Sequence, residues 1–383
     1  MEDQHTQPRK IIYLVPALSV GGAEMFLSTL VNAFVGCGTE QVLVSLSAEN
    51  PLHYAFDPGI RYREFPRRSL TDMGPARELC RFLKEEDPDI IFCLNFFSFA
   101  YLRFAFLLTP LRARAIISYH STIHVTSKDH WMHKLFTRLV RGRDKVVMVS
   151  DNQAAYTIRN YGLRPSQVKV IHNGVDTARW HLPDTVFDRA AFRAGLGIPA
   201  NATVIAMTAA FRPEKNHAGA ISALQLLHAE KRTPAYLLFI GSGPQLEQIR
   251  TLAQNSAIAS YIVFAGSQKD VRPFLWASDL FTLTSTSVET FSIAALEAMA
   301  CGLSGVLTDI GGASEMIKPG ITGRLSGLTP GEIADSWAAT LMDALPPEKV
   351  HRFIATHFNR GKMIREYARE MGLPEEETVT LET

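Results

Sequence analysis

Two glutamates eight residues apart, Glu289 and Glu297, form the pair of side chains best placed for chemistry on a bound ligand. The segment between them passes from a predicted strand into a predicted helix, which Thr290 or Ser292 can cap. Free N–H groups and the positive dipole end at a helix start favour a phosphate. At ~1.5 Å per residue, Glu297 lies roughly 7–8 Å along the helix from Ser292. The two carboxylates can therefore hold opposite ends of one diphosphate-containing ligand.

Two further segments could contact the same diphosphate. Residues 209–217 follow another predicted strand and bring Arg212 and Lys215 to the edge of a sheet, as phosphate binding requires. Gly21 and Gly22 follow the first predicted strand and open a helix, where missing Cβ atoms let the backbone approach a phosphate. The ordinary alternatives are a surface lysine at position 215 and a tight turn at the two glycines. These segments therefore indicate phosphate binding only in combination with the Glu289–Glu297 segment.

His120 follows the predicted strand at 115–119 and so lies at the sheet edge where ligands bind. Its imidazole could hydrogen-bond a sugar or assist an acceptor hydroxyl. The chain has 12 histidines, and a single histidine is more often a structural hydrogen-bonding residue than a catalytic one. Both interpretations of His120 stay open at this stage.

The sequence lacks the patterns that hold metal ions. The four cysteines are scattered, without C-x-x-C spacing or companion histidines, so neither a disulfide framework nor a zinc site is indicated. No Asp-x-Asp pair falls in a suitable loop, so fixed protein cations would replace a divalent ion at the diphosphate. We therefore expect no metal and no other cofactor.

The segment from Glu289 to Gly302 resembles the retaining glycosyltransferases of family 4, also called group 1 glycosyltransferases. Their signature is Glu-x7-Glu followed by Ala-Met-Ala and Gly, as found here. The resemblance implies the GT-B fold and a nucleotide-sugar donor. It implies that Glu297 accepts hydrogen bonds from the ribose hydroxyls and that Glu289 binds hydroxyls of the transferred sugar. Backbone amides around Phe291, Ser292 and Ile293 would then meet the phosphate and the sugar.

The same resemblance assigns roles to other positions. The loop with Gly21 and Gly22 would flank the donor phosphates, and His120 would lie near the donor sugar. His120, Glu289 and Lys215 are the catalytic candidates on this basis. One further match is the Gly-Gly-Ala-Ser-Glu segment that starts at Gly311. Resemblance thus covers nearly the whole chain.

Besides Ser304 and Gly305, which stand where the family more usually has Pro-Val, two positions depart from the family pattern. When Glu214 and Lys215 are aligned with the family's phosphate-binding segment, the usual arginine falls on Ala210. Arg212 could replace that arginine, or phosphate binding could depend on Lys215. Thr290 stands where many relatives have glycine, so the loop cannot freely use positive φ.

The apolar runs predict an α/β fold of two doubly wound Rossmann-like domains. β-branched runs alternate with helix-compatible stretches, which is typical of a parallel sheet with crossover helices. The first set of predicted strands is 11–15, 41–46, 90–94, 115–119 and 145–149, and the second is 204–207, 235–240, 262–264, 279–283 and 305–308. We expect a nucleotide-sugar site in a cleft where the two domains face each other.

The chain length of 383 residues also favours two domains. We place the acceptor-binding domain at 1–176 and the nucleotide-sugar-binding domain at 177–352. By resemblance, a C-terminal helix at about 353–371 crosses back to the first domain. The formal net charge of +1 gives no indication of nucleic acid as a partner.

Two segments bear on membranes. Residues 90–110 are apolar and of spanning length, but Asn95 and Arg103 interrupt them, which favours a buried strand and a packed helix. Residues 128–145 combine cations with apolar side chains and could lie on an anionic membrane. A helix that packs its apolar face on the sheet is the alternative that we expect. The polar N-terminus lacks signal-peptide features, so we expect a cytoplasmic protein, with peripheral contact at the inner face of the membrane left open.

The expected function is retaining transfer of a hexose from a UDP- or GDP-sugar to a glycan, lipid-linked or small-molecule acceptor. Such a hexosyltransferase would serve cell-surface polysaccharide or glycoconjugate synthesis. Retention would follow from front-face attack assisted by the leaving phosphate. The alternatives are a nucleotide-sugar 2-epimerase and a non-catalytic donor-binding partner of another transferase. A dehydrogenase fits least, because no complete Gly-x-Gly-x-x-Gly fingerprint is present.

Overall fold

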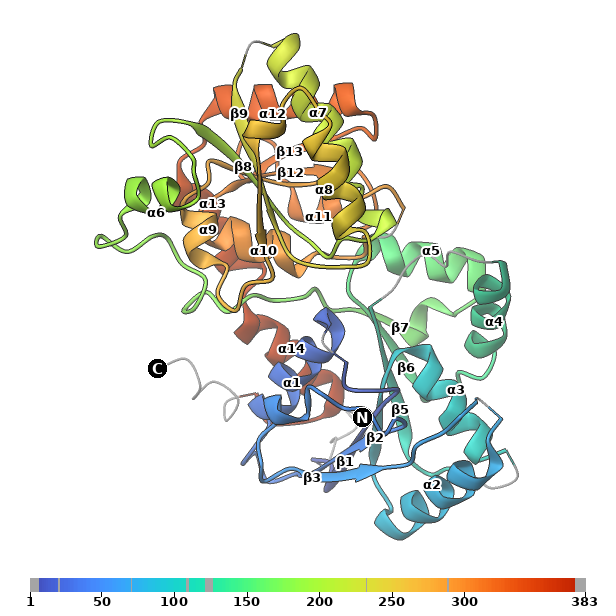
Figure 1. The fold of residues 1–383 in the computed structure, drawn as a ribbon. Coiled ribbons are helices and arrows are strands. Elements are labelled where there is room, and N and C mark those ends of the chain that lie inside the picture. The colour runs from blue at the N-terminus through green and yellow to red at the C-terminus, as the bar shows by residue number, and fades with distance from the viewer. Residues whose placement is uncertain are drawn as a thin grey trace. The chain divides into compact units, whose positions relative to one another are not determined.

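The structure is a computed structural model of the chain, and it describes residues 7–19, 21–69, 71–107, 110–120, 127–231, 233–287 and 289–375. The chain divides into two compact units (Figure 1). The first unit is Met1–His172 with Gly361–Thr383, and the second is Asn173–Arg360. Each unit is an α/β sandwich around one parallel sheet, so the prediction of two doubly wound domains is confirmed.

The first unit contains a seven-stranded sheet in the order β3-β2-β1-β4-β5-β6-β7, and each pair of neighbouring strands in it is parallel. Strands β1, β4 and β5 are buried almost throughout, which explains why they read as continuous apolar runs. The strands are β1 Lys10–Val15, β2 Glu40–Ser45, β3 Arg61–Glu64, β4 Ile90–Leu94, β5 Arg114–Tyr119, β6 Lys145–Met148 and β7 Val168–Val170.

Helices cover both faces of this sheet. One hydrophobic core lies under α2, α3 and α4, and a second lies under α1 and α14. Met363, Ile364 and Tyr367 of α14 are buried in the second core, so the end of the chain completes the first unit. The helices are α1 Gly22–Ala33, α2 Met73–Glu86, α3 Asn95–Ala105, α4 Ser127–Thr137, α5 Asp151–Tyr161 and α14 Arg360–Met371, with short 3₁₀ turns η1 His53–Ala55 and η2 Pro165–Gln167.

The second unit contains a six-stranded sheet in the order β10-β9-β8-β11-β12-β13. Its strands are β8 Thr203–Thr208, β9 Ala235–Ile240, β10 Ile262–Gly266, β11 Leu280–Leu283, β12 Ser304–Thr308 and β13 Gly323–Ser326. Its helices are α6 Arg189–Gly195, α7 His217–Ala229, α8 Leu246–Gln254, α9 Arg272–Trp276, α10 Ile293–Ala300, α11 Ala313–Met316, α12 Pro330–Asp343 and α13 Pro347–His357, with 3₁₀ turns η3 Pro213–Lys215 and η4 Ala259–Tyr261.

The predicted C-terminal helix is present as α14, which belongs to the first unit, but it begins at Arg360 and not at about 353, because α13 and α14 are separate helices. The backbone between them pairs with Val175 instead of continuing the helix: Val175 N donates to Phe358 O and Arg360 N donates to Val175 O, both at 2.8 Å. A Cβ at Gly174 would lie 2.5 Å from Asn359 O, so a glycine permits this close approach. The break therefore follows from a strand-like contact that helical periodicity does not reveal.

Residues 90–105 of the apolar segment form β4 and α3, as predicted. Asn95 opens α3 with a φ of 68° and accepts a hydrogen bond from Phe97 N at 2.9 Å. Arg103 is buried and pairs with Asp144. The two polar interruptions thus have structural partners. Among the helices that the structure describes, none combines the length and hydropathy needed to cross a membrane.

Candidate active site

The sheet order of the second unit places two site loops side by side. Strands β8 and β11 are neighbours, and the strand order runs outward from them in both directions. Open parallel sheets bind ligands at the carboxyl ends of the strands at such a switch point. Lys215 lies in the loop after β8, and Glu289 lies in the loop after β11. Topology alone therefore brings these two predicted residues to one place.

Lys215 and Glu289 form an ion pair. Lys215 Nζ lies 2.6 Å from Glu289 Oε2, and both side chains are mostly buried. Ser285 Oγ donates to the same carboxylate oxygen at 3.0 Å. Charge-assisted hydrogen bonds of this kind hold a side chain firmly when solvent is largely excluded. The carboxylate of Glu289 is thus oriented by one cation and one hydroxyl.

The end of β11 also fixes the backbone of the Lys215 loop. Thr284 Oγ1 lies 3.1 Å from Lys215 O and 3.0 Å from Asn216 O. Thr286 N donates to Glu214 O at 2.9 Å. Asn216 adopts a left-handed conformation with a φ of 55°, and its side chain caps α7. The position of Lys215 is therefore determined from both neighbouring strands.

The Glu289 loop rests against the glycine pair that follows β12. Gly311 has a φ of 56°, and a Cβ built there would overlap the carbonyl oxygen of Glu289. Gly312 N donates to Thr290 O at 2.9 Å. Only glycine combines this backbone conformation with so close an approach. The segment that starts at Gly311, expected only as a family match, thus supports the Glu289 loop.

Ser292 caps α10, which settles the choice between Thr290 and Ser292. Ser292 Oγ accepts from Ala295 N at 3.2 Å, and Ile293 is the first helical residue. Asn173 Nδ2 donates to Phe291 O at 3.1 Å, which fixes the entry to the helix. The remaining first-turn amides have the orientation that suits an anionic group.

Glu297 lies on the second turn of α10, as predicted, and is partly exposed. Burial raises the pKa of its carboxyl to about 7, although the positive charge of Arg179 opposes the rise. A carboxyl group with this pKa titrates near neutral pH. Glu297 can then accept hydrogen bonds from hydroxyl groups, which would stabilise its ionised form.

Arg212 is exposed at the start of η3, and no carboxylate of the described residues forms an ion pair with it. The preceding residue, Phe211, is buried and stacks on His217 with ring centroids 4.0 Å apart. Arg212 N donates to Ala210 O at 2.8 Å. Arg212 therefore extends from an anchored loop, and its role in phosphate binding stays a prediction.

His120 follows β5 in the first unit and lies beside polar groups of that unit. Its Nε2 lies 3.0 Å from Ser118 Oγ, which in turn lies 2.9 Å from Tyr367 OH. Burial lowers the pKa of His120 to about 4. The imidazole is therefore neutral at pH 7 and acts as a hydrogen-bonding group rather than a cation.

Gly21 and Gly22 begin α1, just beyond β1, whose neighbour across the switch point is β4. Gly21 is the N-cap, with an extended φ of −159° that any residue can adopt. Met25 N donates to Gly21 O at 3.0 Å. The two glycines thus lie at the carboxyl edge of the first sheet, and their contact with phosphate stays a prediction.

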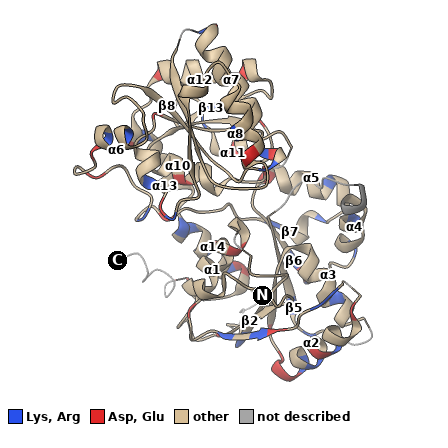
Figure 2. Ribbon diagram, viewed as in Figure 1, with Lys and Arg blue, Asp and Glu red and all other residues tan. Residues whose placement is uncertain are grey.

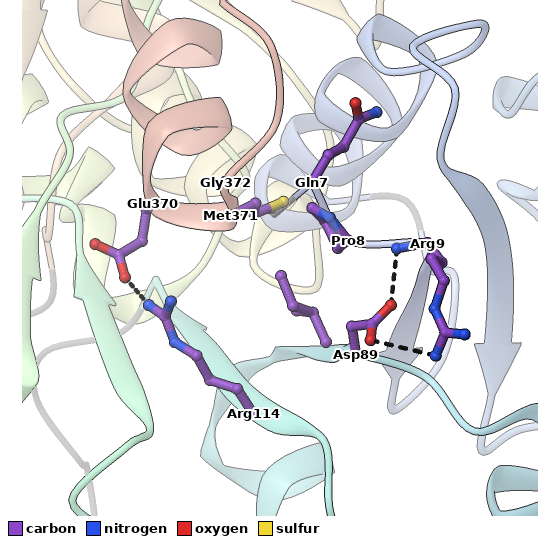
Figure 3. A pocket seen from close by; sticks show the side chains of 9 residues that line it. Gln7, Pro8, Arg9, Asp89, Arg114, Glu370, Met371 and Gly372 are labelled. Atoms are coloured by element: carbon purple, nitrogen blue, oxygen red, sulfur yellow. Dashed lines mark hydrogen bonds and ion pairs between the residues drawn. The ribbon is translucent and has the colours of Figure 1, made fainter. Parts of the chain in front are cut away.

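A hollow of about 260 Å³ lies at the opposite edge of the first sheet (Figure 3). Arg114 at the start of β5 pairs there with Glu370 of α14, and Arg9 N donates to Asp89 at 2.7 Å. His120 follows the other end of β5, six residues from Arg114 or ~20 Å at about 3.3 Å per residue. This hollow therefore belongs to the attachment of α14 and not to the candidate site.

Thr284 and Ser285, which position Lys215 and Glu289, were not predicted from the sequence. The only available signal was the run of hydroxyl residues at the end of the predicted strand, Thr284-Ser285-Thr286-Ser287. Such runs are common at strand ends, where they cap or turn the chain. Thr284 contacts the loop after β8, 68 and 69 residues away in sequence, whereas Ser285 contacts Glu289, four residues along its own loop.

Family models match most of the chain. One described as glycosyl transferases group 1 matches residues 188–358, and one described as glycosyltransferase family 4 matches residues 20–179. The D-inositol 3-phosphate glycosyltransferases of Mycobacterium tuberculosis and Mycobacterium bovis are 31% identical over 211 residues. The match covers 52% of this chain and 41% of those relatives, so this chain spans less than half of their length.

Solved structures share the fold at low identity. Anabaena Alr3699/HepE in complex with UDP is 20% identical, with a TM-score of 0.81 over 95% of this chain and 99% of that chain. A Rickettsia africae glycosyltransferase is 18% identical, with a TM-score of 0.78 over 97% and 99%. A sucrose-phosphate synthase of Thermosynechococcus elongatus is 17% identical, with a TM-score of 0.77 over 94% and 98%.

Proposed function

Because the chain belongs to the group 1 glycosyltransferases and has the GT-B fold, we propose that it transfers a hexose from a nucleoside diphosphate sugar. The observation that carries this proposal is the Lys215–Glu289 pair beside the N-terminus of α10. A cation, a carboxylate and free helix amides together match a diphosphate linked to a sugar. We place the donor in the second unit.

The donor would extend along α10. The ribose hydroxyls would donate to Glu297 on the second turn, and the diphosphate would lie at the first-turn amides. Glu289 would bind hydroxyls of the transferred sugar. The separation between the capped end and Glu297, roughly 7–8 Å along the axis, suits a nucleoside whose phosphates lie beyond the ribose.

The first donors to test are UDP-sugars. Alr3699/HepE of Anabaena was crystallised with UDP, with UDP and glucose, and with UDP-glucose. Its fold is shared at 20% identity, so this likeness sets the order of the test. GDP-sugars come second.

The chemistry would depend on stabilising the leaving diphosphate. Negative charge grows on it as an oxocarbenium-like sugar forms, and Lys215, Arg212 and the α10 amides are suited to that charge. We propose that these fixed groups act without a metal ion. Retention would follow from attack on the face that the phosphate leaves, because no second carboxylate is assigned as nucleophile.

The acceptor is the least defined part of the proposal. We propose a glycan, a lipid-linked sugar or a small molecule as acceptor, with a role in cell-surface polysaccharide or glycoconjugate synthesis. The curated relatives are described as acting on D-inositol 3-phosphate, so an inositol phosphate belongs in the acceptor panel. Neither 2-epimerase activity nor a non-catalytic role is favoured, since the matches are to glycosyltransferases.

The test is release of nucleoside diphosphate from UDP-, GDP- and ADP-sugars in the presence of EDTA. We expect slow release with one donor, and loss of it in Lys215→Ala and Glu297→Ala. Lys231→Ala is the matched control, because Lys231 forms a surface ion pair with Asp335. Release that needs a divalent ion would contradict metal independence. Donor binding without release, with any acceptor, would favour the non-catalytic alternative.

A further inference from the structure

Helix α4 and the turn after it expose apolar side chains that the sequence analysis expected to be packed. Phe136 and Val140 are buried in the core under this helix. Trp131, Leu135 and Leu139 point outward and are 65%, 40% and 37% exposed. The apolar residues thus divide into an inner and an outer set. The outer set follows a spacing of four residues, which keeps its helical members on one face.

Cations accompany this outer apolar set. Lys134, Arg138 and Arg141 are exposed, and none forms an ion pair with a carboxylate among the residues described. The nearest carboxylate in sequence on the C-terminal side, Asp144, is buried and pairs with Arg103. The outer face therefore presents positive charge and apolar surface together.

The helices packed against α4 carry little negative charge, and α4 itself contains one acidic residue, Asp129, against Lys128 and Lys134. Helices α3 and α5 pack against α4. Helix α3 contains no Asp or Glu, and α5 contains only Asp151 at its start, which lies 3.9 Å from His172. Residues 90–172 contain twelve Lys or Arg and three Asp or Glu, although the whole chain is only +1. The distribution of charge along the ribbon can be followed in Figure 2.

We propose that α4 and the turn through Arg143 dock on an anionic phospholipid surface. A helix with exposed tryptophan and leucine among cations can bury its apolar side chains at the headgroup boundary while its cations meet lipid phosphates. Nucleic acid would satisfy the cations but would leave the apolar set in water. An acidic protein would need its own apolar counterpart. A phospholipid surface satisfies both features with one partner.

The proposed docking goes beyond sugar transfer and does not require it. It would bring the first unit to a membrane where lipid-linked acceptors are found. Vesicle binding needs neither donor nor turnover, so its failure and the failure of the proposed transfer can be told apart.

The experiment is sedimentation of the full chain with vesicles of phosphatidylcholine alone or with equal parts of phosphatidylglycerol. We expect binding only to the anionic vesicles, weakened by salt. Trp131 is the most exposed of the four tryptophans, since Trp180 and Trp337 are buried and Trp276 is half-buried. Its emission should move to shorter wavelength on the vesicles and be quenched by brominated lipid. Equal binding to neutral vesicles, or unquenched Trp131, overturns the proposal.

Variants separate the two components of the surface. Lys134→Glu with Arg138→Glu should weaken binding by about tenfold or more, and Trp131→Ser should weaken it too. Trp131→Phe should bind but lose the spectral change. The controls are Lys318→Glu with Arg352→Glu, and Met342→Ser, because these side chains are exposed in the second unit. Equal losses in the controls and the α4 variants, with circular dichroism unchanged, would also overturn the proposal.

Discussion

Lys215 Nζ lies 2.6 Å from Glu289 Oε2, and the two residues come from loops after neighbouring strands at the switch point of the second sheet. Without a ligand, the carboxylate of Glu289 balances the positive charge of Lys215. A diphosphate that binds here must therefore share this cation with Glu289. A donor would draw this cation toward phosphate while Glu289 keeps the hydrogen bond from Ser285. Ser285 therefore matters most when Lys215 is shared with the donor.

The first prediction concerns Ser285 as a positioning residue. Ser285→Ala removes the hydroxyl that lies 3.0 Å from Glu289 Oε2. A hydrogen bond to a charged group contributes roughly 1.5–3 kcal/mol, so we expect kcat/KM to fall about tenfold or more. The fall should lie in kcat more than in KM for the donor, and Ser285→Thr should restore part of it. Ser222→Ala, in α7, should leave both values unchanged. An equal fall of kcat/KM in Ser285→Ala and Ser222→Ala would show that Ser285 is not a positioning residue.

The second prediction concerns the glycine that supports the Glu289 loop. In Gly311→Ala the new Cβ would overlap Glu289 O, so the loop must move. We expect the free energy of unfolding to fall by about 2–4 kcal/mol and transfer activity to be lost. Gly320→Ala is the matched control, because Gly320 also has a positive φ of 72° but has nothing near its Cβ. It should cost only ~1 kcal/mol and keep activity, as measured by urea unfolding and donor turnover.

The third prediction concerns the raised pKa of Glu297, about 7 in the folded chain against an ordinary 4.5. Between these two pH values the unfolded chain loses a proton that the folded chain keeps. Stability therefore falls as pH rises from 4.5 to 7, and the loss persists above 7. Glu297→Gln should remove this loss and stabilise the ligand-free protein at pH 8 by about 1–3 kcal/mol.

The same variant should lose donor affinity, because an amide cannot offer the ionised carboxylate to two ribose hydroxyls. Urea unfolding at pH 4.5 and pH 8 gives the first result, and titration with nucleoside diphosphate gives the second. If the stability that the variant gains over the parent is no larger at pH 8 than at pH 4.5, the pKa of Glu297 is not raised in the folded chain.

The fourth prediction concerns His120, whose pKa is lowered to about 4 by burial. The unfolded chain gains a proton as pH falls from 6.5 to 4, whereas the folded chain stays neutral at this site. Stability is therefore lost over that window as pH falls, and His120→Gln should reduce the loss. The dependence of kcat on pH between 5 and 8 should contain no step from His120. A step near pH 6.5 that disappears in His120→Gln would contradict a neutral imidazole.

The buried strands could be read from the sequence because both faces of a parallel sheet are covered and their runs are apolar. Strand β3 could not, since Arg61–Glu64 is a charged edge strand without an apolar pattern. Strands β7 and β13 have three and four residues, too few for any periodicity. The break between α13 and α14 depends on Val175, far away in the chain.

In the candidate site, too, some residues could be predicted from the sequence and others could not. Glu289, Glu297 and Lys215 could be proposed from the sequence because their spacing relative to strands and helices is local. The hydroxyl of Ser285 and the glycine at 311 act on Glu289 through contacts that only the folded chain reveals. The pKa values of Glu297 and His120 likewise come from burial and not from residue type.

The last prediction addresses the arginine that the family pattern places at Ala210. Arg212 is exposed and unpaired among the described residues, on a loop anchored by the buried Phe211. Its guanidinium is thus free to meet a donor phosphate, and Arg212→Ala should lower kcat/KM about tenfold or more. Ala210→Arg in that background tests the replacement directly, because it returns the cation to the usual position. Recovery of donor turnover would show that one phosphate contact has moved two residues along the loop. If Arg212→Ala leaves turnover unchanged, phosphate binding depends on Lys215 and the α10 amides alone.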